Sequence, residues 1–94
     1  MKTITINSTI AINSDTALAT HMDGEVVILD TVNGKYFGLD GVGVHIWESL
    51  DTAQTVEQLK ASILQEYDVD EGQCEADVIE LLDGLQKAGL IIVS

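Results

Sequence analysis

The sequence predicts a small α+β domain of winged helix-turn-helix type, in which an N-terminal antiparallel sheet packs on three helices. Two observations predict this fold. Residues 3–39 show strand-like alternation and a tight hairpin turn, and from Asp40 onward the apolar residues recur at helical spacing. The chain has 94 residues, of which 46% are hydrophobic, enough for one modest core, so residues 1–94 are assigned to a single domain.

The N-terminal part is predicted to form one antiparallel sheet. Isoleucines alternate with polar residues over residues 3–12, which places them on one face of a strand. Residues 25–39 form a hairpin, because Asn33-Gly34 accepts the positive φ of a tight turn. We expect hairpin 25–39 to share its sheet with strand 3–12. A two-residue loop predicts the cross-strand pairs Val32 with Lys35, Asp30 with Phe37, and Ile28 with Leu39.

Three helices follow. Asp40 is expected to cap the first, and the capping box Thr55-Val-Glu-Gln58 begins the second. Asp70 and Gln73 begin the third, which Gly89 ends. The apolar tail 90–93 is expected to be a strand or a docking segment, since it would otherwise expose its side chains to water.

The charge of the chain excludes several partners. Sixteen Asp and Glu oppose four Lys and Arg, for a net charge of -12. Nucleic acids and anionic membranes are bound through clusters of basic residues, so neither is an expected partner. A winged-helix DNA-binding regulator is an alternative on grounds of fold, but the charge opposes it. The acidic residues between Glu66 and Asp83 form either a solvated helix face or a surface that attracts a basic partner.

No catalytic, metal or cofactor site is predicted. The single cysteine, Cys74, excludes an internal disulfide and a cysteine-rich zinc site, and no motif links it to His21 or His45. A calcium loop counted from Asp68 fails, because Gln73 and Ile79 occupy the positions of the turn glycine and the bidentate glutamate. We therefore expect a protein that is not an enzyme. The absence of a secretory-type N-terminus favours a cytoplasmic location.

An acyl carrier is a further alternative for a small, very acidic protein. Its phosphopantetheine-bearing serine typically lies in an Asp-Ser-Leu motif at the start of a helix. The nearest match is Glu48-Ser49-Leu50, which falls near the end of a predicted helix and after a hairpin that acyl carriers lack. A solvated Ser49 is the simpler interpretation.

An ordered set of short motifs over residues 25–93 resembles the PqqD-like family. The motifs are Lys35-Tyr-Phe-Gly-Leu-Asp40, Ile46-Trp47-Glu48 with Leu50, Thr55-Val-Glu-Gln-Leu59, Tyr67-Asp-Val-Asp70, Asp77-Val78, Leu81-Leu82 with Leu85, and Gly89-Leu-Ile91. The resemblance implies a winged-helix recognition element for the leader of a ribosomally made, post-translationally modified peptide (RiPP). A free-standing chain of this size is most similar to the lasso-peptide branch.

The lasso-peptide resemblance implies specific partners. These are the leader region of a precursor peptide, a separate cysteine-type leader peptidase and, downstream, an ATP-dependent macrolactam synthetase. The sequence departs from the family pattern in two respects: Asp40 replaces a frequent Asn, and the arginines of many members are absent. A partner that docks through ion pairs would therefore supply the basic residues itself.

The resemblance also implies binding by β-strand addition, and the sequence contains the parts that this mode needs. Strand 35–39 is expected to be an open edge beside the third helix, with Phe37 in the core and Tyr36 in the groove. The predicted peptide-binding residues are Val32, Lys35, Tyr36, Phe37, Gly38, Leu39, Asp77, Val78, Leu81, Leu82 and Leu85. Leu82→Lys is expected to weaken leader binding more than tenfold.

Two further features bear on the predicted groove. Gly84 either opens a pocket for a bulky leader side chain or permits close packing of helix and sheet. Asp77, Glu80 and Asp83 would form an acidic rim that meets lysines of a leader.

Overall fold

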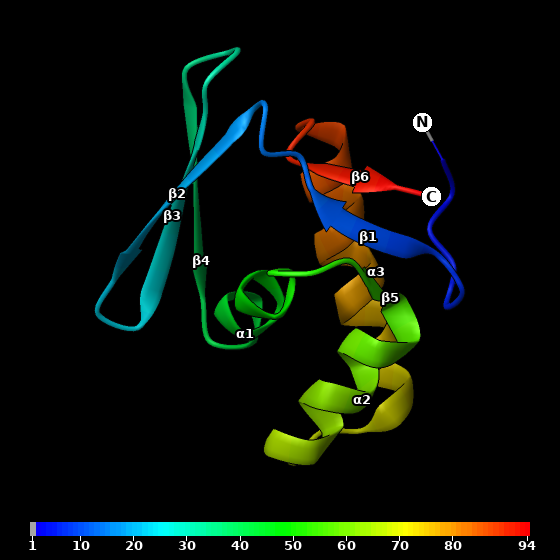
Figure 1. Cartoon of the computed structure of the whole chain (residues 1–94). Coiled ribbons are helices and arrows are strands. Elements are labelled where there is room, and N and C mark those ends of the chain that lie inside the picture. Colours follow the sequence, from blue (N-terminus) through cyan, green and yellow to red (C-terminus); the bar gives the residue numbers. More distant parts are fainter. Residues whose placement is uncertain (1) are drawn as a thin grey trace.

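The computed structural model describes residues 2–94, which form two three-stranded antiparallel sheets and three α-helices (Figure 1). The elements are β1 (Thr9–Ile12), β2 (Ala17–Met22), β3 (Glu25–Asp30), β4 (Lys35–Asp40), α1 (Val42–Ser49), β5 (Gln54–Thr55), α2 (Val56–Glu66), α3 (Glu71–Lys87) and β6 (Ile91–Val93). The α+β class and the three helices predicted from the sequence are confirmed.

The first sheet has the order β2-β3-β4. Its β3–β4 hairpin is the one predicted at residues 25–39, but the predicted register is wrong by two residues. Asp30 pairs with Lys35, and Ile28 pairs with Phe37. The turn is longer because the Asp30 carboxylate accepts hydrogen bonds from the backbone N–H groups of Val32 (3.0 Å) and Asn33 (3.1 Å), which holds a four-residue loop closed.

The partner of the hairpin also differs from the prediction. Residues 3–12 do not join this sheet; β3 pairs instead with β2, from Ala17↔Asp30 to Met22↔Glu25. The Asp23-Gly24 dipeptide makes the β2–β3 turn, with Gly24 at a φ of 71°. Strand β2 was not predicted, because apolar and polar residues alternate only weakly along it.

The second sheet has the order β5-β1-β6 and joins both ends of the chain. β1 pairs with the C-terminal strand, Ile12 opposite Ile91 and Ile10 opposite Val93, so the apolar tail is a strand. The side chains of Asn13 and Thr16 donate to the carbonyl oxygen of Gly89, at 3.1 and 2.6 Å. These bonds fix the link between β1 and β2 against the end of α3, so that β1 pairs with β6 while β2 enters the other sheet.

The helix ends are largely those that the sequence predicts. Thr55 and Gln58 form a complete capping box at α2, and Asp70 caps α3 by accepting from the Gln73 N–H at 3.0 Å. Asp40 is not a cap: it is the last residue of β4, and Gly41, at a φ of 51°, precedes α1. Helix α3 ends at Lys87, and Gly89, two residues further on, has a φ of 77° that suits glycine.

Helix α3 contacts α2 on one side and β6 on another, while α1 contacts β4 and α2. Figure 1 shows α1 between the β2-β3-β4 sheet and α2, with the long α3 behind β1 and β6. The core is aliphatic with one tryptophan. Its fully buried members include Ile10, Ile28, Ile46, Leu59, Ile63 and Leu82. No helix within residues 2–94 is long and apolar enough to cross a membrane.

Candidate peptide-binding site

The outer edge of β4 is open. Strand β4 ends the order β2-β3-β4, so one of its edges pairs with β3 and no strand among residues 2–94 pairs with the other. An edge strand presents a row of unpaired N–H and C=O groups to whatever lies beside it. The prediction that strand 35–39 is an edge is confirmed.

A groove of about 460 Å³ lies between this open edge and α3. We call it the β4–α3 groove. Its lining residues are Phe37, Gly38 and Leu39 from β4, and Asp77, Glu80, Leu81, Gly84 and Leu85 from α3. Asp77, Leu81 and Gly84 are spaced four and three residues apart, which places them in one row along the helix. Apolar side chains therefore lie between the helix and the strand, and carboxylates stand at the rim.

The structure confirms the core role expected for Phe37 but not the groove role expected for Tyr36. Phe37 lines the groove and also packs against the core, whereas Tyr36 is 70% exposed and does not line the groove. Phe37 shares a sheet face with its partner Ile28, and Tyr36 shares the opposite face with Leu29. The expectation for Tyr36 was wrong because the core and the groove lie on the same side of the sheet.

The predicted α3 residues divide into two groups. Asp77, Leu81 and Leu85 line the groove, but Val78 and Leu82 are buried in the core and do not line it. At 0% exposure, Leu82 has no surface that a leader could touch. Leu82→Lys would therefore place a charge in the core and test stability rather than binding.

Two residues predicted for the site lie away from the groove lining. Val32 is in the β3–β4 turn and is 70% exposed. Lys35 is exposed at the start of β4, opposite Asp30. Gly38 and Leu39 line the groove as predicted, so the β4 contribution is concentrated in the second half of the strand.

Gly84 opens the groove. A Cβ atom built at this position would meet no heavy atom within 4 Å, so close packing of helix against sheet does not explain the glycine. Glycine within a helix costs about 1 kcal/mol relative to alanine. The helix carries this cost at a position that faces open space in the groove.

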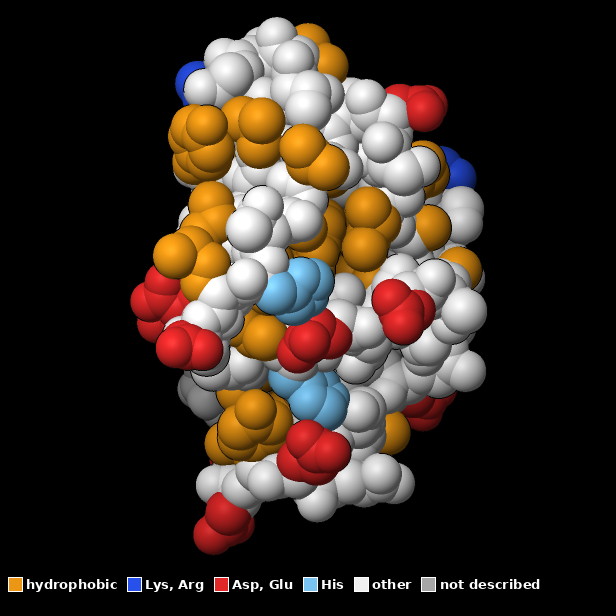
Figure 2. All heavy atoms as spheres, turned by 60° about the vertical axis from the view of Figure 1, so that its left-hand side comes forward, with side chains coloured by type: hydrophobic (Ala, Val, Ile, Leu, Met, Phe, Trp, Pro, Cys, Tyr) orange, Lys and Arg blue, Asp and Glu red, His pale blue; other side chains and the backbone are white. Residues whose placement is uncertain are grey.

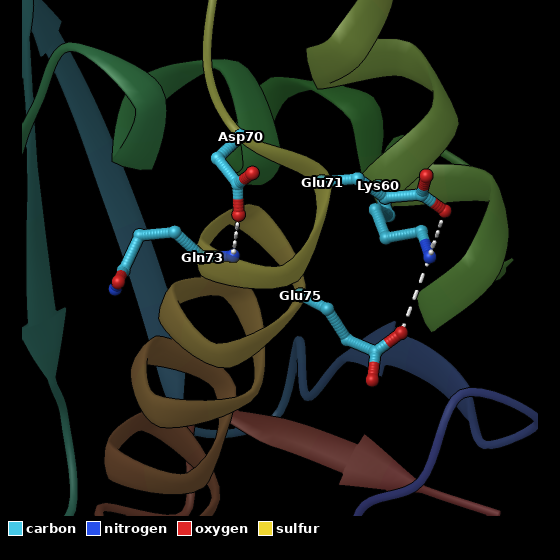
Figure 3. A network of polar contacts seen from close by, with 5 residues as sticks. All are labelled: Lys60, Asp70, Glu71, Gln73 and Glu75. Carbon is cyan, nitrogen blue, oxygen red and sulfur yellow. Dashed lines mark hydrogen bonds and ion pairs between the residues drawn. The ribbon is translucent and has the colours of Figure 1, made fainter.

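The acidic surface of α3 is partly neutralised. Lys60 on α2 lies 3.1 Å from the carboxylate of Glu75 and 3.2 Å from that of Glu71 (Figure 3). Hydrogen bonds to Glu75 and Glu71 raise the pKa of Lys60. Within the described residues, no lysine pairs with Asp77 or Glu80 at the groove rim. Asp77 and Glu80 therefore keep their negative charge beside the groove.

The residues with nucleophilic or imidazole chemistry lie outside the groove. His45 links two helices, with Nε2 2.7 Å from the Ser62 Oγ and Nδ1 3.3 Å from the Glu66 carboxylate. The Ser49 hydroxyl donates to the carbonyl oxygen of His45 at 2.7 Å. Cys74 is buried, and burial raises the pKa of its thiol. No group of three or more His, Cys, Asp or Glu residues within residues 2–94 could hold a metal ion.

Comparison with known families shows to which family this chain belongs. Residues 25–91, which include the β3–β4 hairpin and all three helices, match the family described as coenzyme PQQ synthesis protein D (PqqD). The chain belongs to the PqqD family. The resemblance drawn from the sequence motifs is confirmed. No curated protein is significantly similar to this PqqD-family chain.

Two solved structures share the fold of this PqqD-family chain. One is TbiB1 in complex with the TbiA(beta) leader peptide, at 37% identity and a TM-score of 0.80, covering 86% of this chain and 93% of that one. The other is lasso peptide synthetase B1 complexed with the leader peptide, at 21% identity and a TM-score of 0.77, covering 88% and 96%. At 21% identity, the second structure shows a fold shared with a lasso-peptide protein.

The PqqD-family chain also exposes apolar side chains on the face of the β2-β3-β4 sheet that points away from the core. Leu18 and Met22 are each 59% exposed, and Tyr36 lies on the same face. Figure 2 presents this side of the molecule, where hydrophobic side chains gather in patches among acidic and histidine side chains. This face is separate from the groove lining.

Proposed function

We propose that this protein is a non-catalytic peptide-binding module that captures the leader of a RiPP precursor of the lasso-peptide class. The leader adds as a strand to the open edge of β4 and lies in the β4–α3 groove. The observation that carries the proposal is an unpaired strand edge facing an apolar groove on α3. The likeness to TbiB1, whose structure contains a leader peptide, supports it.

In strand addition, the main chain and the side chains of the protein contribute differently to leader binding. Hydrogen bonds from the β4 backbone provide affinity for any extended peptide, while the groove selects among side chains. Because side chains alternate along a strand, every second leader residue points toward Phe37, Leu81 and Gly84. The leader loses conformational entropy on ordering, which limits the affinity and keeps binding reversible.

The acidic groove rim favours a cationic leader. The chain has a net charge of -12, and the carboxylates of Asp77 and Glu80 stand at the groove. A negative electrostatic field raises the association rate of a basic peptide, and this effect weakens as the ionic strength rises. Lysines that flank the apolar leader residues would meet this rim.

Delivery to a separate cysteine-type leader peptidase is the second part of the proposal. The groove holds the leader on the α3 side of β4, so the opposite sheet face, with Leu18, Met22 and Tyr36, stays uncovered for an enzyme. The chain has four Lys and Arg in total, so a peptidase or macrolactam synthetase would supply the basic partners of any interfacial ion pair. We place this step in the cytoplasm.

The test is a two-dimensional amide NMR titration with a synthetic leader from the precursor encoded nearest the gene. A scrambled peptide of the same composition is the control. We expect saturable shifts at Gly38, Leu39 and the α3 residues of the groove, with none of comparable size from the scrambled peptide. Shifts that fall outside β4 and α3 would contradict strand addition at this edge.

A further inference from the structure

Strand β2 forms a second open edge of the β2-β3-β4 sheet. It pairs with β3 along its whole length, from Ala17 to Met22, and no strand among residues 2–94 pairs with its other side. Figure 1 shows the β2–β3 turn at the margin of the molecule, away from α2 and α3. The proposed leader site uses β4, at the other end of this sheet, and leaves the β2 edge open.

The β2 edge has none of the features that keep exposed strands from pairing. Proteins commonly protect such edges with charged side chains, proline or β-bulges. Strand β2, Ala-Leu-Ala-Thr-His-Met, contains no Asp, Glu, Lys, Arg or Pro, and its register with β3 runs without a bulge. Because the chain has sixteen Asp and Glu, an edge without a carboxylate is where a second copy meets the least local repulsion.

The hydrogen bonds of the hairpin show which backbone groups of β2 point outward. The Thr31 N–H donates to the Thr16 carbonyl oxygen at 2.9 Å, so the even-numbered residues of this segment face β3. The Ala17 N–H donates outside the ladder, to a carbonyl oxygen of the β1–β2 link, at 2.9 Å. Because this direction alternates along a strand, the N–H and C=O groups of Ala19 and His21 point to the open edge.

Strand β2 complements itself in an antiparallel pair centred on Thr20. In this register Ala19 of each copy lies opposite His21 of the other, and the two residues exchange their outward hydrogen bonds. Leu18 lies opposite Met22 of the other copy, and the two Thr20 residues face each other. These are the closer, non-hydrogen-bonded pairs, in which apolar and Thr–Thr contacts are favourable. Leu18 and Met22 are each 59% exposed in the single chain, so pairing covers apolar surface.

We infer that β2 is a self-association edge, through which two copies of this protein pair about a two-fold axis at Thr20. The two three-stranded sheets then form one continuous sheet, with hydrogen bonds exchanged at both Ala19–His21 pairs. Both β4 edges lie at the ends of this sheet, so a dimer keeps its two β4–α3 grooves open. We expect a dissociation constant on the order of 100 µM, because so short a strand pair buries less than the roughly 1,200–2,000 Å² of stable interfaces.

Analytical ultracentrifugation of the whole protein measures the association. We expect a monomer–dimer equilibrium that tightens about tenfold when the ionic strength rises from about 0.01 to 0.15 M, because each chain carries a net charge of -12 and the Debye length falls from roughly 30 to 8 Å. A saturating leader should leave the dimer intact, since the leader occupies the other end of the sheet. A monomer at every concentration up to about 1 mM, or a dimer that the leader dissociates, would overturn the inference.

A proline variant separates this edge from the rest of the surface. Ala19→Pro removes an outward N–H and leaves the hydrogen bonds between β2 and β3 in place, which is the edge position where strands tolerate proline. We expect this variant to weaken the dimer at least tenfold. Ala19→Ser is the matched control, which keeps the N–H and should associate as wild type. Equal association of the proline variant and the wild type, with both folded by circular dichroism, would contradict pairing through β2.

Cysteine cross-linking tests the register. The Cα atoms of an opposite, non-hydrogen-bonded pair lie about 4.5 Å apart, within the reach of a disulfide. With oxidised glutathione as oxidant, we expect Thr20→Cys to form a covalent dimer. Leu18→Cys should remain monomeric under the same conditions, because the two copies of position 18 lie far out of register. Cys74 is buried and common to both variants. A covalent dimer from Leu18→Cys and none from Thr20→Cys would refute the pairing centred on Thr20.

Discussion

Adjacent leucines on α3 separate the energetics of the fold from those of peptide binding. Leu82 is completely buried, whereas Leu81 is partly exposed and lines the β4–α3 groove. Leu82→Ala removes three carbon atoms from a close-packed core, which costs about 3 kcal/mol. In a domain of this size each kcal/mol lowers the melting temperature by roughly 4–8 °C, so the loss is on the order of 12–24 °C.

Leu81→Ala should lose less folding stability than Leu82→Ala and more affinity for the leader. The Leu81 residue is partly exposed, so truncation costs less folding free energy than at Leu82, about 1–2 kcal/mol. The bound leader covers the exposed part of the side chain, so we expect the affinity for the leader to fall about tenfold. Thermal unfolding followed by circular dichroism measures the first quantity. Isothermal titration with the leader, well below the melting temperature of each variant, measures the second.

The comparison between the two variants can refute the reasoning. We expect Leu82→Ala to bind the leader within about threefold of wild type while it remains folded, because the Leu82 side chain does not line the groove. If Leu81→Ala were the more destabilised of the two, or bound the leader as tightly as wild type, the assignment of the core and groove sides of α3 would be wrong.

Three further predictions concern charged side chains. Hydrogen bonds from the Asn33 side chain and backbone, and from the Val32 N–H, lower the pKa of Asp30. The Asp30 carboxylate therefore stabilises the fold above the unfolded-state pKa, and this stabilisation is lost as the pH falls through the lower folded-state pKa. In Asp30→Asn, the free energy of unfolding measured in urea should depend less on pH below about pH 4 than in the wild type. The raised pKa of Lys60 acts in the opposite direction: its stabilisation is present below about pH 10.4 and is lost above it, and Lys60→Met should abolish this alkaline dependence. Glu80→Lys should slow leader association in stopped-flow at low salt, with the difference shrinking as added salt screens the groove rim; an equal difference at all salt concentrations would argue against steering.

Local patterns in the sequence predicted most of the elements. The capping residues Thr55 and Asp70 and the change from period two to helical spacing located the helices. Strand β2 was missed, although Asp23-Gly24 is a typical hairpin dipeptide, because the residues before it alternate only weakly. The hairpin register depended on the Asp30 side chain, whose bonds to the turn are invisible to a pattern of hydrophobicity.

The site could be predicted only in part. The β4 edge and α3 were identified, but which α3 residues face the groove depends on where α2 and β6 cover the helix. Successive residues on a helix differ by about 100° in direction, so Leu81 faces the groove while Leu82 enters the core.

The most direct test of the central claim is a backbone N-methylation scan of the leader. A strand added to β4 directs alternate peptide N–H groups at the open edge, and methylation removes both the hydrogen and the space it occupies. We predict that methylation at every second leader position within the bound segment weakens binding at least tenfold, while the intervening positions change it little. A uniform response along the segment, or none, would contradict strand addition to β4.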